Sequence, residues 1–392
     1  MKNFTWWIYF VILILVVSCQ PETNFYKGNL HAHSNWSDGD HYPEMAMDWY
    51  RSNGYQFAVL SDHNILQTGE KWIYANRNET TTEAYQKYLE RFGEEWIEKK
   101  YIHDTLLVRL RTFDEYRGQF DEPGSFISIL AEEITDQYNG KPVHMNAINL
   151  ESLVPPQHGP SIVAILNKTA ETIKIQEDSL DHSVFSCINH PNFGWAIQKE
   201  DLVTAAGFQF FEVFNGHPSV RNYGDSLHLS TEDLWDEVNI DRLERGIPLL
   251  LGIATDDTHH YHEFRKERAN PGRGWVMVKA ETLENSNIIN GLKSGDFYAS
   301  TGVVISDYKI TSRRYSLEVK KDPGIEYTIL FIGCMKGKKE AEILYEVKGL
   351  KALYRFSGDE LFVRAKVISS KTKSNPFADG DVEVAWLQPV SY

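Results

Sequence analysis

The sequence predicts an α/β barrel of the TIM type, followed by a small all-β sandwich. The chain has 392 residues, 42% of them hydrophobic, which is enough for two domains. Up to about residue 304, strand-like runs alternate with helix-like segments, as is typical of parallel βα units. Nearly every strand-like run ends in His, Asp or Glu, and functional residues of such barrels gather at the carboxyl ends of the strands.

The expected strands and helices follow from runs of apolar residues and from charge spacing. The strand-like runs are 25–30, 57–60, 125–131, 143–150, 184–188, 208–214 and 247–254. Helix-like segments are expected near 43–53, 70–100, 160–180 and 231–245. The insert at 65–120 is longer than an ordinary βα loop, so we expect it to cover the site.

The residue pattern of the sequence changes after the helix-like segment that ends near residue 295. From about 305 onward, short alternating runs are separated by turns such as Asp322-Pro323-Gly324, which predicts a β-sandwich. It holds no cluster of ligand-type residues, so a packing or docking module is the favoured interpretation. We therefore expect a metal-binding barrel over 22–304 and a β module over 305–392.

The N-terminus has the features of an export signal. The apolar run from Trp6 to Val17 is shorter than the ~20 residues of a spanning helix and suits a signal peptide. The segment Val16-Val17-Ser18-Cys19 resembles a bacterial lipobox, which implies cleavage before Cys19 and its lipidation. We therefore expect residues 1–19 to direct an exported lipoprotein to the periplasm or cell surface. Gln20 is typical of an outer-membrane address in a Gram-negative cell.

Charge and cysteine content narrow the function classes. The formal net charge is −15, which disfavours nucleic-acid binding, because such proteins need a basic face. A small phosphorylated substrate stays possible, since bound metal reverses the local field. Only Cys187 and Cys334 follow the lipobox, too few for a disulfide framework.

The stretch NLHAHSNWSDG, residues 29–39, raises the question of metal binding. His31 and His33 are two apart, so on a strand both side chains point to one face. Other expected strand ends add ligand-type residues, and the full set is His31, His33, Asp38, His63, Glu133, His144, His190, Asp257 and His259. Imidazole and carboxylate suit zinc, manganese or iron. There is no Gly-x-Ser-x-Gly motif, which disfavours a serine nucleophile.

These motifs together resemble those of the PHP (polymerase and histidinol phosphatase) family. The matching segments are HAHSNWSDG, LSDHN, AEEIT, PVHMN, INHPN and TDDTH, in that order. GWVMV, GDFYASTG and EVFNGHP are most similar to the branch of carbaryl-hydrolase-type proteins. The resemblance implies a distorted (β/α)7 barrel, two or three divalent ions (Zn, Mn or Fe), and hydrolysis of phosphate esters.

The resemblance also implies how the ligands are divided. The first ion would be bound by His31, His33, Glu133 and Asp257. Glu133 would bridge to a second ion on His144 and His190, and a third would be bound by Asp38, His63 and His259. Some family members have His where Asp38 stands, and many have Asp where Asn29 stands, so the third site and the tuning of the first can differ here. Glu132 competes with Glu133, but by alternation it is expected to face the barrel exterior.

Further polar residues at the same rim are candidates for catalysis and substrate binding. Asp62 could orient the ring of His63, and His217 is the second catalytic candidate. The substrate-binding candidates are Asn64, Asn192, Asn215, His262 and Arg273. Each has a structural alternative, because Asn is common in turns and Arg273 lies in the turn Pro-Gly-Arg-Gly.

The favoured interpretation is a phosphoesterase that hydrolyses a small phosphate ester with a metal-activated hydroxide. The first alternative is a metal-dependent hydrolase of carboxyl or carbamate esters, because the ligand motifs hold no Arg or Lys for a phosphate. The second is a non-catalytic surface lipoprotein whose β module binds a partner. The expected partners are a small ester and, through Cys19, a membrane.

Overall fold

The structure is a computed structural model that describes residues 24–391. The predicted signal peptide, the lipobox and the lipidation site Cys19 lie outside the described residues. Among residues 24–391, no helix combines the length and the apolar composition that crossing a membrane requires.

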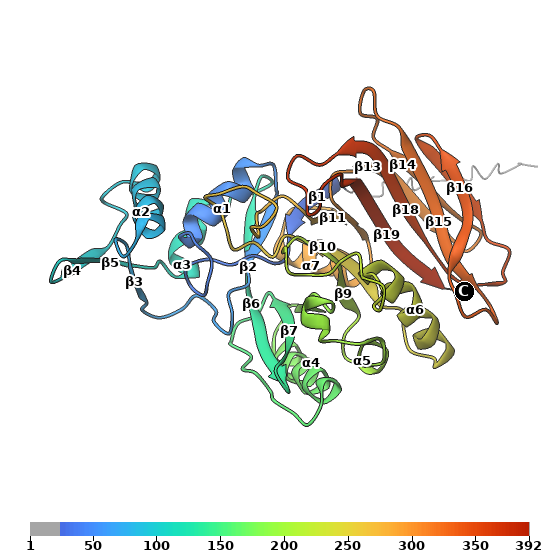
Figure 1. Cartoon of the computed structure of the whole chain (residues 1–392), viewed down its shortest axis with the longest axis horizontal. Helices are drawn as coiled ribbons and strands as arrows, with labels where there is room; N and C mark the ends of the chain where they lie inside the picture. Colours follow the sequence, from blue (N-terminus) through green and yellow to red (C-terminus); the bar gives the residue numbers. More distant parts are fainter. Residues whose placement is uncertain (1–23, 392) are drawn as a thin grey trace, which may run out of the picture.

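A thirteen-stranded mixed sheet runs through the molecule (Figure 1). Its order is β10-β9-β8-β7-β6-β2-β1-β11-β12-β19-β18-β15-β16. The strands that surround the predicted ligands are β1 (Asn24–Asn29), β2 (Phe57–Leu60), β6 (Ile127–Tyr138), β7 (Lys141–Ile148), β8 (Phe185–Ile188), β9 (Phe210–Asn215) and β10 (Leu251–Thr255). The strands that continue the sheet are β11 (Trp275–Ala280), β12 (Phe297–Ser300), β15 (Tyr327–Met335), β16 (Glu342–Lys348), β18 (Glu360–Thr372) and β19 (Val382–Ser391).

The regular βα alternation expected of a TIM barrel is not what the described residues show. Strands β6 and β7 form an antiparallel pair joined by a tight turn, and β7 pairs antiparallel with β8. The pairs β1–β2, β2–β6, β8–β9 and β9–β10 are parallel. As a result Glu133 and His144 lie within strands rather than at their ends.

The segments that directly follow β1 and β10 are nevertheless hydrogen-bonded to each other, although these two strands lie at opposite ends of the series from β10 to β1. The His33 amide donates to the Thr258 carbonyl at 2.8 Å, and the Asp257 amide donates to the His31 carbonyl at 3.0 Å. Residues that follow β1 and β10 in sequence therefore lie side by side, which brings the histidines after β1 next to the acidic residues after β10.

The helices between these strands bury one face each. The helices are α1 (Pro43–Ser52), α2 (Glu79–Phe92), α3 (Phe113–Tyr116), α4 (Ile162–Ser179), α5 (Lys199–Thr204), α6 (Thr231–Glu244) and α7 (Asn285–Lys293). Helix α1 starts with Pro43, whose fixed φ suits the first helical position, and it buries Met47 and Tyr50. Ser161 caps α4 by accepting the amide of Ala164, and Ile165 and Ile173 face the core.

The insert at 65–120 is only partly helical, so the helix expected over 70–100 is too long. Helix α2 starts after Asn78, which forms a capping box with Thr81. Around it, β3 (Trp72–Tyr74), β5 (Thr105–Arg109) and β4 (Lys99–Ile102) form a separate three-stranded sheet. The insert lies at the end of the molecule opposite the C-terminal strands in Figure 1.

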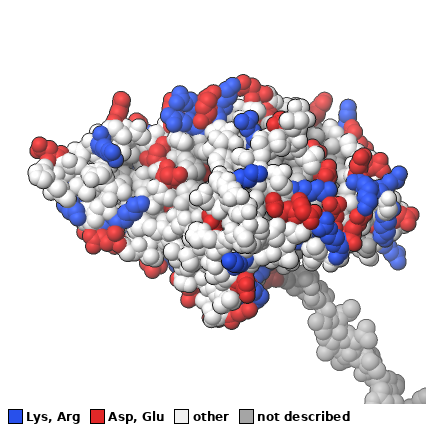
Figure 2. Space-filling view, turned by 60° about the horizontal axis from the view of Figure 1, so that its bottom comes forward, with Lys and Arg blue, Asp and Glu red and all other residues white. Residues whose placement is uncertain are grey.

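The C-terminal strands form two facing sheets. Strands β13 (Ile305–Thr311), β14 (Arg314–Val319) and β17 (Lys351–Arg355) form one, and the other continues the large sheet through β12 and β19. A core that includes Tyr315, Phe331 and Leu387 lies between them. The boundary at 304/305 stays a prediction. Figure 2 shows acidic and basic side chains interspersed over this end, where Lys339 Nζ lies 2.6 Å from Glu244.

Candidate metal centre

The nine residues that the sequence groups as ligands lie together in the structure. They form four overlapping groups whose possible ligand atoms lie within 4.8 Å of one another. The groups are His33, Asp38, His63, His259; His31, His190, Asp257; His31, His33, Glu133; and His63, Glu133, His144. Within each group the side chains are close enough to share a divalent ion.

The backbone pairing after β1 explains why His31 and His33 face the same centre. The segment is extended, and Ala32 forms a parallel bridge with Thr258. The two rings therefore project from the same side of the chain, while Ala32 points away. Both histidines and Ala32 are fully buried.

Glu133 lies at the middle of the cluster because β6 continues past the end of β2, where it faces His63. Its Oε1 lies 3.1 Å from His144 Nδ1 and 3.3 Å from His190 Nε2. Its Oε2 lies 2.8 Å from His63 Nδ1. One carboxylate thus serves imidazoles on both of its sides, as a bridging ligand does.

The distances around His31 and His33 fit shared metal ligation better than hydrogen bonding. His31 Nε2 lies 3.4 Å from Glu133 Oε1 and 3.3 Å from Asp257 Oδ1. His33 Nε2 lies 3.4 Å from Glu133 Oε2 and 3.3 Å from Asp257 Oδ1. Two ligand atoms, each ~2.05 Å from one tetrahedral ion, lie about 3.3–3.4 Å apart.

The two Nε2 atoms are also buried without a hydrogen-bond partner among the described residues. An unsatisfied buried nitrogen is costly, and a pair facing two carboxylates is what a cation would satisfy. The residues present therefore fit a divalent metal, and the sequence prediction of a metal-binding site agrees with the geometry.

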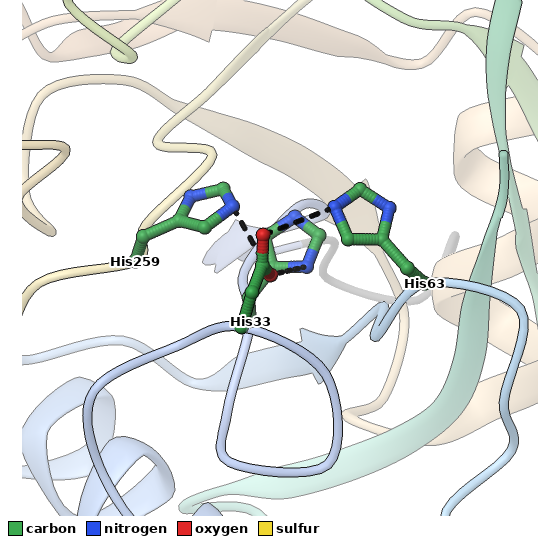
Figure 3. A group of neighbouring side chains, drawn as sticks. His33, His63 and His259 are labelled. Carbon is green, nitrogen blue, oxygen red and sulfur yellow. Dashed lines mark ion pairs between the residues drawn. The ribbon is translucent and has the colours of Figure 1, made fainter.

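A second part of the cluster lies toward solvent. In Figure 3, His33, His63 and His259 point toward one another from three different segments. Asp38 lies between them, 3.6 Å from His63 Nε2 and 3.4 Å from His259 Nε2. The Asp38 side chain is 55% exposed, so the centre opens to solvent on this side.

The electrostatics favour charged carboxylates. Burial alone would raise the pKa of Glu133, but the charges of His31, His63 and His144 outweigh it and hold the pKa well below its usual range. Burial would also raise the pKa of Asp257, but His31 and His33 outweigh this effect and lower the pKa well below its usual range. Burial, together with His259, lowers the pKa of His33 to about 3. At His31, His190 and His259, burial would lower the pKa of the imidazole, but neighbouring carboxylates outweigh burial and raise the pKa. Metal binds the neutral imidazole, so binding of a divalent ion here would release protons.

Glu212 contacts the cluster, although the predicted site omits it. It is fully buried on β9, and its Oε1 lies 2.7 Å from His31 Nδ1. A proton on Nδ1 leaves the Nε2 lone pair for the other ligands, which is how carboxylates orient metal-binding histidines. This glutamate begins the segment EVFNGHP, which resembles one branch of the PHP family but contributes no residue to the predicted ligand set.

Asp62 does not orient His63, so the catalytic role predicted for it is wrong. Its carboxylate is fully buried and accepts bonds from the amides and hydroxyls of Ser34 and Ser37. It also accepts a bond from Gln67 Nε2 at 2.6 Å. Asp62 therefore holds the loop that leads to Asp38. The His63 Nδ1 lies instead 2.6 Å from Thr135 Oγ1.

Two predicted substrate-binding asparagines have their amides occupied by the fold. Asn64, at φ 53°, accepts the Thr135 amide and donates to the Thr135 carbonyl, which continues the pairing of β2 with β6. Asn192 donates to the carbonyls of Arg221 and Leu229. Both side chains therefore make structural contacts, and substrate binding by them stays a prediction.

Asn215 and His217 lie beside the cluster. The Asn215 amide donates to Glu212 Oε2 at 2.7 Å and to Asp257 Oδ2 at 3.1 Å, so it supports a predicted ligand rather than a substrate. The His217 ring centroid lies 5.4 Å from that of His259. Burial lowers the pKa of His217 to about 4, so its ring is neutral at pH 7.

His262 and Arg273 do not face the cluster either. His262 lies between Lys87 Nζ, at 3.1 Å, and the Asp40 carbonyl, at 3.1 Å. The Arg273 guanidinium is buried and donates to the carbonyls of Gly216 and Arg265. The structure therefore gives both residues positions that join loops, not positions that bind a phosphate.

Glu132 lies on the opposite side of β6 from Glu133. It is fully buried, accepts the Val154 amide at 2.6 Å, and burial raises its pKa to about 8. The choice of Glu133 over Glu132 therefore agrees with the positions of the two side chains.

The chain has a weak likeness to proteins of known structure. No family model and no curated protein matches the chain. Among solved structures, it is similar to a two-domain protein from Bacteroides vulgatus that contains a predicted PHP-like metal-dependent phosphoesterase. The sequence identity is 14%, the TM-score is 0.41, and the match covers 93% of this chain and 95% of that chain.

Proposed function

We propose that this chain is a metal-dependent hydrolase of a small phosphate ester. The observation that carries the proposal is the position of Glu133, whose two oxygens face different sets of histidines. A bridging carboxylate is a property of centres with adjacent ions, and such centres stabilise both the attacking and the leaving oxygen of a phosphoryl transfer.

Bound divalent ions would supply Lewis acidity, which lowers the pKa of water and withdraws charge from an ester oxygen. The chain's own residues hold and orient the side chains that would bind these ions. Glu212 keeps the proton of His31 on Nδ1, and Asn215 holds Asp257 through its amide. The exposed Asp38 marks the side from which a substrate reaches the centre.

His217 is the proposed hydrogen-bond donor to the substrate. The Ser219 amide donates to His217 Nδ1 at 3.1 Å, so the proton of the neutral ring resides on Nε2. From its place beside His259, this Nε2–H donates a hydrogen bond to an ester oxygen in the proposed reaction. The attacking water supplies the proton that the leaving oxygen takes up.

Membership of the PHP family, with its distorted (β/α)7 barrel, is part of the proposal, as is the carbaryl-hydrolase-type branch. The ordered motifs from residue 29 to 259 support it. So do the two backbone hydrogen bonds that bring the segment after β1 beside the segment after β10.

One observation favours a carboxyl or carbamate ester as the alternative substrate. Arg273 was the one predicted cation for a phosphate, and its guanidinium is occupied by backbone carbonyls. The four ligand groups of the described residues contain His, Asp and Glu only. A neutral carbonyl substrate requires no further cation.

The test is turnover by the purified full-length chain loaded with Zn²⁺, Mn²⁺ or Fe²⁺, against aryl phosphomonoesters, phosphodiesters and carboxyl esters. Phosphoester turnover that His190→Ala abolishes and His182→Ala preserves is the expected result; His182 is half-buried outside the ligand groups. Turnover of carboxyl esters alone would establish the alternative. Stoichiometric metal without turnover of any ester would favour a binding lipoprotein.

We also propose export and lipid anchoring at Cys19, which rests on the sequence Val16-Val17-Ser18-Cys19. Expression in a Gram-negative host with labelled palmitate tests it. Labelled wild-type chain in the outer-membrane fraction and unlabelled Cys19→Ser chain are expected, and equal labelling of both would contradict it.

A further inference from the structure

A cavity lies apart from the predicted metal ligands. It has a volume of about 560 Å³ and is lined by parts of β1, α1, β11, the loop 264–272 and the loop 374–379. None of the nine predicted ligands lines it. Cavities of a few hundred Å³ are the usual size for small-molecule sites.

The side chain of Lys27 has an unusual environment in this cavity. Its Nζ lies 3.8 Å from the ring centroid of Tyr55 and 4.0 Å from that of Trp275. Among residues 24–391, no carboxylate lies within ion-pair distance of this nitrogen, and burial lowers the pKa of Lys27 to about 8. A half-buried ammonium is usually paired with a carboxylate. The ammonium of Lys27 therefore has N–H groups that are free to donate hydrogen bonds to a bound anion.

Aromatic rings form another part of the wall. The rings of Trp49 and Phe264 stack at a centroid distance of 6.3 Å and an interplanar angle of 25°. Phe264 is 50% exposed, which leaves ring surface free. Tyr55 is 2% exposed, and its hydroxyl has no hydrogen-bond partner in the described part of the chain.

The side chains that line the cavity carry a net positive charge, although the formal net charge of the whole chain is −15. Three cationic side chains line the cavity, Lys27, Arg265 and Lys266. The one carboxylate is that of Asp379, and it already lies 2.5 Å from Lys266 Nζ. Arg265 likewise lies 3.1 Å from Glu263, so among the described residues Lys27 is the lining cation without an ion pair, and an anion with an apolar ring suits this lining.

We propose that this cavity binds a small aromatic carboxylate. The carboxylate accepts hydrogen bonds from the Lys27 ammonium, and the ring lies against Trp49 and Phe264. Charge-assisted bonds of this kind give the site its preference for the acid over a neutral ligand of the same shape. The site is independent of the metal centre, so it binds with or without metal.

The test is calorimetric titration of the purified full-length chain with 2-naphthoate and with the neutral 2-naphthamide. Chelator-treated protein is used, so that the acid cannot bind through a metal ion. Binding of the naphthoate at least about tenfold tighter than the amide is expected, since a charged hydrogen bond is lost with the amide.

Variants assign the binding to the cavity. Lys27→Met keeps the aliphatic stem and should weaken naphthoate binding by about tenfold or more. Phe264→Ala, at an exposed position, should weaken it severalfold. Lys100→Met is the matched control, because Lys100 Nζ lies 3.6 Å from the Trp72 ring but outside the cavity.

Three outcomes would overturn the proposal. The first is no naphthoate binding at millimolar concentration, and the second is equal affinity for acid and amide. The third is a Lys27→Met chain that binds as the Lys100→Met chain does, with both chains folded by circular dichroism.

Discussion

The carboxylate of Glu212 lies 2.7 Å from Nδ1 of His31, with both side chains fully buried. The same carboxylate accepts the Thr255 hydroxyl at 2.6 Å and the His190 amide at 2.8 Å. It therefore fixes the orientation of His31 and joins three segments of the cluster. Glu212 would therefore affect metal binding indirectly, by positioning the predicted ligands.

Glu212→Gln should weaken metal binding by about 10- to 100-fold, because it no longer fixes the proton on His31 Nδ1. Metal affinity from competition with a chromophoric chelator is the measurement. The control is Glu44→Gln, also fully buried and hydrogen-bonded, to Tyr88 and Trp96, away from the cluster. Equal affinity of the two variants would contradict the role of Glu212.

Asp62→Ala should lower the free energy of unfolding by about 2–4 kcal/mol, because the buried donors of Ser34 and Ser37 lose their acceptor. Urea denaturation followed by tryptophan fluorescence measures it. Asp104→Ala, at an exposed position, should leave stability unchanged. An Asp62→Ala chain as stable as wild type would mean that the loop is held by other contacts.

Acid should destabilise the C-terminal strands through Glu360. Burial opposes ionisation of this group, but the amides of Ser357 and Gly358 and the Tyr354 hydroxyl outweigh it and lower its pKa to about 2. The stabilisation is present above the usual pKa of 4.5 and is lost as pH falls from there toward about 2. Thermal melts of Glu360→Gln should show a smaller loss over this window than wild type. Parallel curves would contradict it.

Arg364 joins α6 to β18 through a buried ion pair. Its Nε lies 2.6 Å from Asp236, and both side chains are nearly inaccessible. Arg364→Met should cost about 3–5 kcal/mol because it leaves a buried carboxylate uncompensated. The double variant with Asp236→Leu should recover part of that loss in chemical denaturation. A double variant less stable than Arg364→Met would contradict this account.

Much of the cluster could be predicted from the sequence, because residue spacing and strand alternation within short segments indicate which side chains share a face. His31 and His33 share a strand face by spacing alone, and Glu133 differs from Glu132 by alternation. The order of the motifs then grouped residues far apart in the chain. Side-chain chemistry and periodicity are properties of the sequence, so they carry this information without coordinates.

The remaining residues depend on tertiary contacts that no local pattern encodes. Asn64 and Arg273 have suitable chemistry for a substrate, but neighbouring backbone groups occupy them. Glu212 lies in the segment EVFNGHP, but its contacts with His31 and Thr255 could not be predicted, because these partners come from other segments of the chain. The insert was expected to be helical from its charges, yet the short apolar runs around Ile73 and Val108 pair as strands.

The central claim, that the cluster binds divalent metal through Glu133, is tested most directly by a pair of neighbouring variants. Metal content of wild type, Glu133→Gln and Glu132→Gln is measured by mass spectrometry after loading and desalting. Both glutamates are buried on β6, but only Glu133 faces the histidines. The account predicts two or three ions per chain in wild type and Glu132→Gln, and fewer in Glu133→Gln. Equal metal content in all three chains, or none in wild type, would contradict it.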